Sequence, residues 1–442
     1  MKGKHVVVLA FPFGSHAAPL LELIHSIAVS SPGVLFSFFS TSMSNKSLFS
    51  NRSYNNIKPY DVDDGLPKDY VFSNNPQEPV ELFLKATPGN FKTAMDVAVT
   101  EIGRKASCLV SDAFLWFTGD IAQELNVPWV PLWTAAPHSL LVHVETQLIR
   151  QKFPPTGCDE NQLVEILPEF SVRAADLPEG VASGDLNSCF ATMLYRMGKT
   201  LPQATAVAIN SFEDVHIRAV DELKSKFHKF LNVGPFSLKA PPSWMSDEHG
   251  CLEWLDQHDY ASVAYISFGR VITPPPHELI ALAEALEESG VPFIWSFRGN
   301  AEEKLPKGFL QRTSRRGKIL PWASQLLVLA HPSVGVFVTH CGWNSILESI
   351  IAGVPMICRP FFGDQKLNMV TLEKVWGFGV GVEGGVFTKN GAKKALELGL
   401  LSKQGKEMRE KIRGLKENAY KAVGSDGSST ENFKTLKDIV TQ

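Results

Sequence analysis

The stretch that decides the fold is VGVFVTHCGWNS, residues 334–345. Its first part, Val334–His340, is mostly apolar and rich in valine, which predicts a buried strand. Gly342 then permits a tight turn, and the helical pattern of Ser345–Gly353 begins near Asn344. A buried strand followed at once by a turn and a helix is typical of a parallel sheet that helices cover on both faces.

The same alternation extends outward from this stretch through the second half of the chain. It predicts strands at Val263–Phe268, Phe293–Phe297, Lys318–Leu320, Val334–His340, Pro355–Arg359 and Gly379–Val382. It predicts helices at His277–Ser289, Ser345–Gly353 and Gly405–Val423.

The first half repeats the pattern independently. Strands are expected at His5–Ala10, Val34–Ser40, Ile57–Val62, Cys108–Ser111, Trp129–Leu132 and Val207–Asn210. Helices are expected at Ala18–Val29, Glu78–Ala86, Phe91–Ile102 and Phe117–Leu125. Both halves therefore predict a doubly wound α/β arrangement.

A proline-rich polar stretch separates the two halves and is typical of a linker. We expect an α/β chain of two Rossmann-like domains whose parallel sheets face a cleft. The expected boundaries are 1–233 for the first domain, 234–244 for the linker, 245–425 for the second domain and 426–442 for a final helix.

Composition excludes several classes of protein. The chain has 442 residues, 44% of them hydrophobic, and a net charge of −3, so it lacks the basic excess typical of nucleic-acid binding. No apolar run is long enough to span a bilayer, and the N-terminus does not resemble a signal peptide. Six scattered cysteines without a CxxC pair predict free thiols and no zinc site, which fits a cytoplasmic protein. The 28 Phe against 7 Tyr suit a dry core, or a pocket for a flat apolar ligand.

Ligands bind beyond the carboxyl ends of the strands in open parallel sheets. This rule alone selects Phe13–His16, Asp112, Thr134, Gly269-Arg270, Trp322, His340–Ser345 and Phe361–Gln365.

Several of these positions suit a nucleotide sugar, although each also has an ordinary structural interpretation. A glycine turn before a helix N-terminus suits a diphosphate, to which His340 adds a hydrogen bond or a positive charge, with Asn344 or Ser345 capping the helix. The same turn is also what an ordinary connection between a strand and a helix requires, without any ligand. Glu348 could accept both hydroxyls of a ribose, or it could simply stabilise the helix dipole. Trp322 could stack on a flat base, or it could belong to the core. Asp364 and Gln365 suit sugar hydroxyls or a solvated loop.

These signals form one ungapped segment from Trp322 to Gln365 that resembles the signature box of the plant family 1 UDP-sugar glycosyltransferases. Further matches resemble the flavonoid (anthocyanidin or flavonol) 3-O-glucosyltransferase branch. They are Ala10–Pro19, Ser111–Phe114, Trp133–Ala135, Pro274–Pro276, Phe361–Gln365 and Ser428–Phe433.

The resemblance implies the GT-B fold, with the acceptor in the first domain, the UDP-sugar in the second and the last helix packed back on the first. It implies that Trp322 stacks on uracil, that Ala323 and Gln325 contact the base and ribose region, and that Glu348 binds the ribose. His340, Asn344 and Ser345 would contact the diphosphate, and Asp364 and Gln365 the sugar. In this family Gln at position 365 accompanies glucose, and His accompanies galactose. The remaining donor-site residues implied are Arg270, Ser296, Trp343 and Thr134. The acceptor residues implied are Gly14, Gln77, Phe114, His138, Phe190 and Phe362.

The resemblance also makes His16 the general base and Asp112 its partner, although His16 alone would read as a turn histidine. A histidine can take a proton from a phenolic hydroxyl near neutral pH, and a buried carboxylate stabilises the imidazolium. The acceptor oxygen would then attack the anomeric carbon with inversion and release UDP. The helix dipole and His340 would stabilise the diphosphate, so no metal and no cofactor beyond UDP-glucose is expected.

Two departures from the family pattern stand out. Arg270 replaces a small hydroxyl residue near the diphosphate, where it would grip the phosphates, block the sugar or swing away. Ser324 replaces proline, and we expect it to cap the next helix.

The sequence thus predicts a monomeric enzyme that moves glucose from UDP-glucose to a flavonoid 3-hydroxyl. The alternatives are another UDP-sugar, such as galactose or rhamnose, another phenolic acceptor, or a flavonoid-binding homologue that Arg270 impairs. The absence of GxSxG and of GxGxxG after the first strand disfavours a hydrolase and a dehydrogenase.

Overall fold

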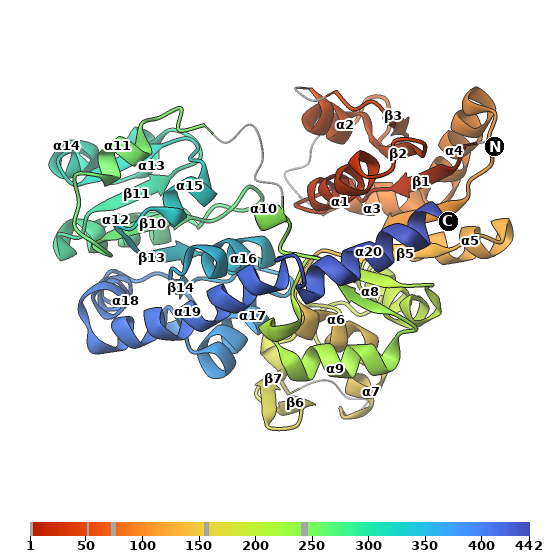
Figure 1. Ribbon diagram of the computed structural model, residues 1–442. Helices are drawn as coiled ribbons and strands as arrows, with labels where there is room; N and C mark the ends of the chain where they lie inside the picture. The colour runs from red at the N-terminus through yellow and green to blue at the C-terminus, as the bar shows by residue number, and fades with distance from the viewer. Residues whose placement is uncertain (1–2, 51–52, 72–76, 154–158, 240–245) are drawn as a thin grey trace. The chain divides into compact units, whose positions relative to one another are not determined.

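The computed structural model describes residues 3–50, 53–71, 77–153, 159–239 and 246–442 (Figure 1). The chain forms two compact units. The first unit comprises Met1–Leu167, Glu179–Phe236 and Ser425–Gln442, and the second comprises Pro168–Pro178 and Ser237–Gly424. The expected first domain ran unbroken from 1 to 233, whereas Pro168–Pro178 group with the second unit. Residues 240–244 of the expected linker lie outside the described residues.

The first unit is built on a parallel sheet of seven strands in the described chain, ordered β3-β2-β1-β4-β5-β8-β9. The central strand β1 has the sequence HVVVL, and all five of its residues are buried, because helices cover both faces of the sheet. The strands of this unit are β1 His5–Leu9, β2 Leu35–Thr41, β3 Ile57–Val62, β4 Cys108–Asp112, β5 Trp129–Trp133, β6 Leu163–Leu167, β8 Val207–Ile209 and β9 Phe230–Asn232.

The helices of the first unit follow its strands, as the alternating sequence pattern predicts. They are α1 Ala17–Val29, α2 Ser42–Phe49, α3 Glu78–Ala86, α4 Gly89–Ile102, α5 Thr118–Leu125, α6 Pro137–Val144, α7 Thr146–Gln151, α8 Cys189–Thr200, η2 Leu201–Gln203, η3 Glu213–Val215 and α9 Ile217–Lys226.

The last helix, α20 (Ser428–Thr441), belongs to the first unit, although most of the second unit precedes it in the chain. It packs on β9 and β4, and its Leu436 and Val440 are buried in the core beside β1. The amide nitrogen of Asn432 donates to the carbonyl oxygen of Asn232 at 3.1 Å. Apolar burial and this hydrogen bond together attach the C-terminus to the first sheet.

The second unit has a parallel sheet of six strands in its described part, ordered β12-β11-β10-β13-β14-β15. Its core is formed by side chains such as Ile266, Phe293 and Val338, which helices cover on both faces. The strands are β7 Phe170–Arg173, β10 Val263–Ser267, β11 Phe293–Ser296, β12 Gly317–Leu320, β13 Val334–Thr339, β14 Met356–Cys358 and β15 Gly379–Gly381.

The helices of the second unit complete the alternation, and α10 (Phe236–Lys239) lies where the chain passes from the first unit to the second. They are η1 Ala174–Asp176, α11 Cys251–Leu255, α12 Pro276–Ser289, α13 Ala301–Lys304, α14 Phe309–Thr313, α15 Gln325–Ala330, α16 Trp343–Ala352, α17 Gln365–Thr371, η4 Leu372–Trp376 (a π-helix), η5 Glu383–Gly385, α18 Lys389–Leu401 and α19 Lys403–Ala422.

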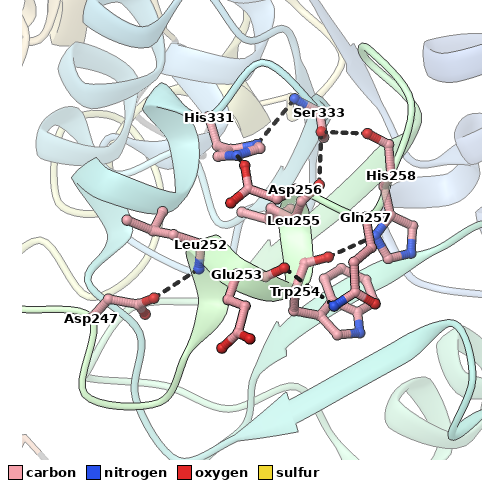
Figure 2. A network of polar contacts seen from close by, with 10 residues as sticks. All are labelled: Asp247, Leu252, Glu253, Trp254, Leu255, Asp256, Gln257, His258, His331 and Ser333. Carbon is pink, nitrogen blue, oxygen red and sulfur yellow. Dashed lines mark hydrogen bonds and ion pairs between the residues drawn. The ribbon is translucent and has the colours of Figure 1, made fainter.

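A polar network closes the amino end of the second sheet (Figure 2). Ser333, directly before β13, places its hydroxyl 2.9 and 2.8 Å from the carbonyl oxygens of Leu255 and His258. His331 pairs with Asp256 at 3.1 Å, and Asp247 accepts from the backbone of Leu252 at 2.8 Å. These polar groups are bonded to one another or to the backbone. The network at the amino end of the sheet therefore has a structural role.

The expected strands are confirmed within one or two residues at each end. The pattern missed β6, β7, β9 and several helices, among them α18. Five cysteines are free thiols as expected, and Cys158 lies outside the described residues. Across the described residues, no helix is both long and apolar enough to cross a membrane.

Candidate active site

Each sheet reverses its strand order at one place, and polar side chains gather there. In the first sheet the reversal lies between β1 and β4, and in the second it lies between β10 and β13. Loops that leave such neighbouring strands in opposite directions open a crevice at their carboxyl ends. The predicted residues His16 and Asp112 belong to the first of these places, and Gly269 and His340 belong to the second.

The first cluster joins His16, Asp112 and Thr134. His16 lies directly before α1, Asp112 is the last residue of β4, and Thr134 follows β5. The Nδ1 atom of His16 lies 2.9 Å from Oδ2 of Asp112 and 3.1 Å from Oγ1 of Thr134. The Asp112 side chain is 1% exposed, whereas that of His16 is 18% exposed. A buried carboxylate therefore supports a histidine that solvent and ligands can reach.

This geometry fixes the tautomer of the imidazole. An ionised carboxylate can only accept, so Nδ1 of His16 carries the proton and Nε2 carries the lone pair. The backbone N–H of Phe114 donates to the other oxygen of Asp112 at 2.9 Å, which holds the carboxylate in place. A histidine that a buried carboxylate orients in this way has the geometry that general-base catalysis requires.

Aromatic rings surround this histidine. The rings of Phe114 and Phe11 lie 4.4 and 5.2 Å from the His16 ring, centroid to centroid. Phe190 contacts Phe114, and Phe83 contacts both Phe11 and Phe13. The sequence predicted Phe114 and Phe190 as acceptor residues and selected Phe13 by its place after a strand, but it gave no such role to Phe11 or Phe83. The excess of phenylalanine was the available signal.

Three other predicted acceptor residues occupy different environments in the first unit. Gly14 has a φ of +64° and lies beside the His16 ring, so it belongs to the cluster. Gln77 is exposed and is the N-cap residue of α3. His138 is fully buried on α6, 5.6 Å from the ring of His216, and the structure does not bring it to the exposed side of the cluster.

In the second unit, the turn after β13 leads into α16. Gly342 is the N-cap residue, and the described chain provides no side-chain cap there. The expectation that Asn344 or Ser345 caps this helix is therefore wrong, because both lie within its first turn. The first N–H groups of an α-helix have no acceptor inside it and can bind an anion.

His340 is packed between two glycines. A Cβ at Gly269 would come within 2.9 Å of its Cε1 atom, and a Cβ at Gly342 within 2.5 Å of its Nε2 atom. Burial lowers the pKa of His340 to about 4. The ring is therefore neutral at pH 7 in this structure, and the contact that it offers in this state is a hydrogen bond.

Gln325, Glu348 and Ser345 form a network at the start of α15 and α16. The amide nitrogen of Gln325 donates to Glu348 and approaches Ser345 Oγ at 3.4 Å, while Tyr265 donates to its oxygen at 3.3 Å. Trp322 is 39% exposed and Ala323 is buried. Ser324 occupies the N-cap of α15, but it makes no side-chain cap bond within the described chain, contrary to expectation.

The turn before α17 carries Phe362, Asp364 and Gln365. The side-chain oxygen of Gln365 accepts from the backbone N–H groups of Phe361 and Phe362 at 2.8 and 3.2 Å. Its NH₂ group is thereby fixed as the end that can donate to a ligand. The amide nitrogen of Asn368 donates to Asp364 at 3.0 Å and to the carbonyl oxygen of Cys341 at 2.9 Å.

The remaining donor-site predictions differ in exposure. Arg270 is exposed and forms no hydrogen bond or ion pair with the described residues. Ser296 ends β11 and lines a small cavity together with Gly269 and Arg298. Trp343 is buried, with its ring 6.4 Å from that of Trp376, while Asn344 is half-buried. Thr134, which the resemblance assigned to the donor site, lies in the first unit, where its hydroxyl contacts His16.

Comparison with known proteins matches this architecture to a family. The family model "UDP-glucoronosyl and UDP-glucosyl transferase" matches residues 243–415. The chain is 59% identical to a flavonoid 3-O-glucosyltransferase of Medicago truncatula, covering 99% of this chain and 97% of the relative. It is 51% identical to an anthocyanidin 3-O-galactosyltransferase of Actinidia chinensis var. chinensis, with the same coverage.

Among solved structures, the chain resembles a UDP-glucose:anthocyanidin 3-O-glucosyltransferase crystallised with UDP. The TM-score is 0.93 and the identity 42%, over 100% of this chain and 99% of that one. This chain therefore belongs to the UDP-sugar glycosyltransferase family. It is a UDP-glycosyltransferase with the GT-B fold, as its resemblance to the family predicted.

Proposed function

We propose that this enzyme transfers glucose from UDP-glucose to the 3-hydroxyl of a flavonol or anthocyanidin, with inversion at the anomeric carbon. The observation that carries the proposal is the pairing of His16 with the buried Asp112. A partly exposed imidazole with a free basic nitrogen, surrounded by phenylalanines, suits the deprotonation of a flat phenolic acceptor. The names of the similar proteins support the choice of flavonoid and of position 3.

The first step is proton removal in the first unit. Nε2 of His16 takes the proton of the acceptor hydroxyl, and Asp112 stabilises the imidazolium that forms. The acceptor oxygen then forms a bond to the anomeric carbon of glucose as the bond from that carbon to the diphosphate oxygen breaks. UDP leaves with the electron pair, and His16 later returns its proton to solvent.

The second unit provides the donor contacts in this proposal. Negative charge on the leaving diphosphate is stabilised by the first N–H groups of α16 and by a hydrogen bond from neutral His340. Trp322 stacks on the base, and the Gln325–Glu348 pair binds the ribose region. Asp364 and the oriented NH₂ group of Gln365 bind the sugar. The proposal needs no metal ion, and the monomeric state and cytoplasmic location stay predictions.

UDP-galactose is the second candidate donor. A relative named as a galactosyltransferase is 51% identical to this chain, so overall similarity does not choose the sugar. Gln365 favours glucose by the family pattern, and its bonds to the Phe361 and Phe362 backbone fix the orientation on which that preference depends.

The decisive experiment measures UDP-glucose turnover with quercetin and cyanidin on the natural chain and on Arg270→Thr side by side. A 3-O-β-glucoside from the natural chain, identified by chromatography and NMR, supports the proposal. Turnover by Arg270→Thr alone shows that Arg270 impairs this chain or redirects it to another donor, and UDP-galactose and UDP-rhamnose are then compared. Binding of flavonoid without turnover of any UDP-sugar by either protein contradicts the proposal.

A further inference from the structure

One buried side chain joins the two turns that carry the proposed donor contacts. Asn368 lies on α17 and is 0% exposed. Its amide nitrogen donates to the carbonyl oxygen of Cys341 at 2.9 Å and to Oδ2 of Asp364 at 3.0 Å. An amide NH₂ group has two hydrogens, so both donors are used by these two turns.

The first partner of Asn368 is a strained residue. Cys341 has a φ of +64°, a left-handed conformation that side chains other than glycine adopt at a cost. Its peptide plane leads into the N-cap Gly342, and in a trans peptide the N–H points opposite to the carbonyl. When Asn368 binds the Cys341 carbonyl, it therefore sets the direction of the N–H of Gly342 and the entry of the chain into α16.

The second partner is a carboxylate that the proposed function assigns to the sugar. Asp364 is the N-cap residue of α17, and its backbone carbonyl accepts from the backbone N–H of Asn368 at 2.8 Å. The side-chain bond to Asn368 fixes one carboxylate oxygen, and with it the rotamer that places the other oxygen.

We propose that Asn368 is a positioning residue that holds the turn before α16 and the turn before α17 in register, so that diphosphate and sugar are gripped together. The inference rests on the proposed function, because it assumes that these turns bind those two parts of a UDP-sugar. The relative position of the two turns matters most in the transition state. Negative charge then develops on the diphosphate as its bond to the anomeric carbon breaks. Loss of Asn368 should therefore lower kcat more than it raises KM.

The turn before α17 has other supports, so a variant of Asn368 should still fold. Gln365 holds the backbone of Phe361 and Phe362, and the guanidinium of Arg359 lies 4.1 Å from the Phe361 ring centroid. Arg359 is itself paired with the buried Glu278. These contacts do not involve Asn368.

The test compares Asn368→Asp with the matched control Thr371→Val. Asparagine and aspartate have the same shape, but the carboxylate lacks both N–H donors and repels Asp364. Thr371 is also buried on α17, and among the described residues its hydroxyl bonds only within the helix, to the Leu367 carbonyl at 2.9 Å. We expect Asn368→Asp to lose about tenfold or more in kcat with UDP-glucose and to bind UDP several-fold more weakly, while Thr371→Val keeps both values.

The ratio of kcat/KM for UDP-glucose to that for UDP-galactose separates positioning from a general effect on folding. The fraction of folded enzyme cancels in this ratio, so a purely structural role leaves it unchanged. We expect the ratio to move toward one in Asn368→Asp. An unchanged ratio together with wild-type UDP affinity overturns the inference.

Two further arms keep the test decisive. If Asn368→Asp does not fold, Asn368→Ser, which retains one hydroxyl donor, is measured in its place under the same criteria. If the wild type does not turn over UDP-glucose, the proposed function fails, and calorimetry with UDP still tests Asn368. Weaker UDP binding by the variant then supports its hold on the turn before α16, and equal binding overturns it.

Discussion

Two histidines follow strands at the switch points of the two sheets, and their surroundings differ completely. His16 is partly exposed and bonded to a buried carboxylate and a hydroxyl. His340 is packed between Gly269 and Gly342, and burial lowers its pKa to about 4. A carboxylate partner suits a histidine that must become charged, whereas a tight slot between two glycines, with no ion partner in the described chain, suits one that must stay neutral.

The comparison shows how one residue type takes two roles in a single enzyme. In the proposed reaction His16 accepts a proton, and His340 gives a hydrogen bond without carrying charge. The glycines around His340 matter because any Cβ there would meet the ring. The following predictions test the two environments separately.

The largest effect is expected for His16→Ala. Loss of the general base should lower kcat by about 10³-fold, because positioned bases contribute about 10² to 10⁴-fold. UDP affinity, measured by calorimetry, should stay at the wild-type value. His228→Ala, an exposed histidine of the same unit, serves as the control and should remain fully active. Equal loss of turnover and UDP affinity would remove the base assignment.

The next effect is expected for Asp112→Asn. The amide has the same shape but cannot stabilise an imidazolium, so kcat should fall by about 10²-fold, the lower end of what a general base contributes, while KM for UDP-glucose changes little. Steady-state kinetics with quercetin measure both values. If kcat stays within about twofold of the wild type, the carboxylate does not support the base.

Gly269→Ala should disturb the packing around His340. The new methyl group would come within 2.9 Å of His340, at a residue whose φ is +73°. We expect a loss of about 1–3 kcal/mol in the free energy of unfolding, together with weaker UDP binding. Gly290→Ala is the matched control, since Gly290 has a φ of +69° and a Cβ there would have no described atom within 4 Å. Equal effects of the two substitutions would show that the His340 contact carries no cost.

The smallest effect concerns acid stability. In the unfolded chain a histidine takes up a proton as the pH falls below about 6.5, whereas folded His340 stays neutral down to about pH 4. Its contribution to stability is therefore complete above about pH 6.5 and is lost as the pH falls toward 4.

The measurement is denaturant unfolding at pH 7 and pH 5. From pH 7 to pH 5, the free energy of unfolding of His340→Gln should fall by about 1–2 kcal/mol less than that of the wild type. Burial also lowers the pKa values of His143 and His216 to about 4, so a part of the pH dependence remains in the variant. The same loss in variant and wild type would contradict the neutral state of His340.

Much of this arrangement could be predicted from sequence, because apolar runs mark buried strands and ligand residues follow them. His16 and Asp112 lie 96 positions apart, yet the parallel order of β1 and β4 brings the ends of these strands together. The neutral state of His340 could not be predicted, because it depends on how closely Gly269 approaches from another strand. Asn368 was missed for a similar reason, since its two acceptors depend on side-chain placement within a packed helix.

The division of the chain into units has a practical consequence for building chimeras between relatives. The chain changes unit four times, because the first unit takes three segments and the second takes two. A single exchange point near residue 236 would separate α20 from β9, on which it packs, and would assign Pro168–Pro178 to the wrong parent. Donor and acceptor preferences are therefore best recombined by exchanging α20 and Pro168–Pro178 together with the units to which they belong.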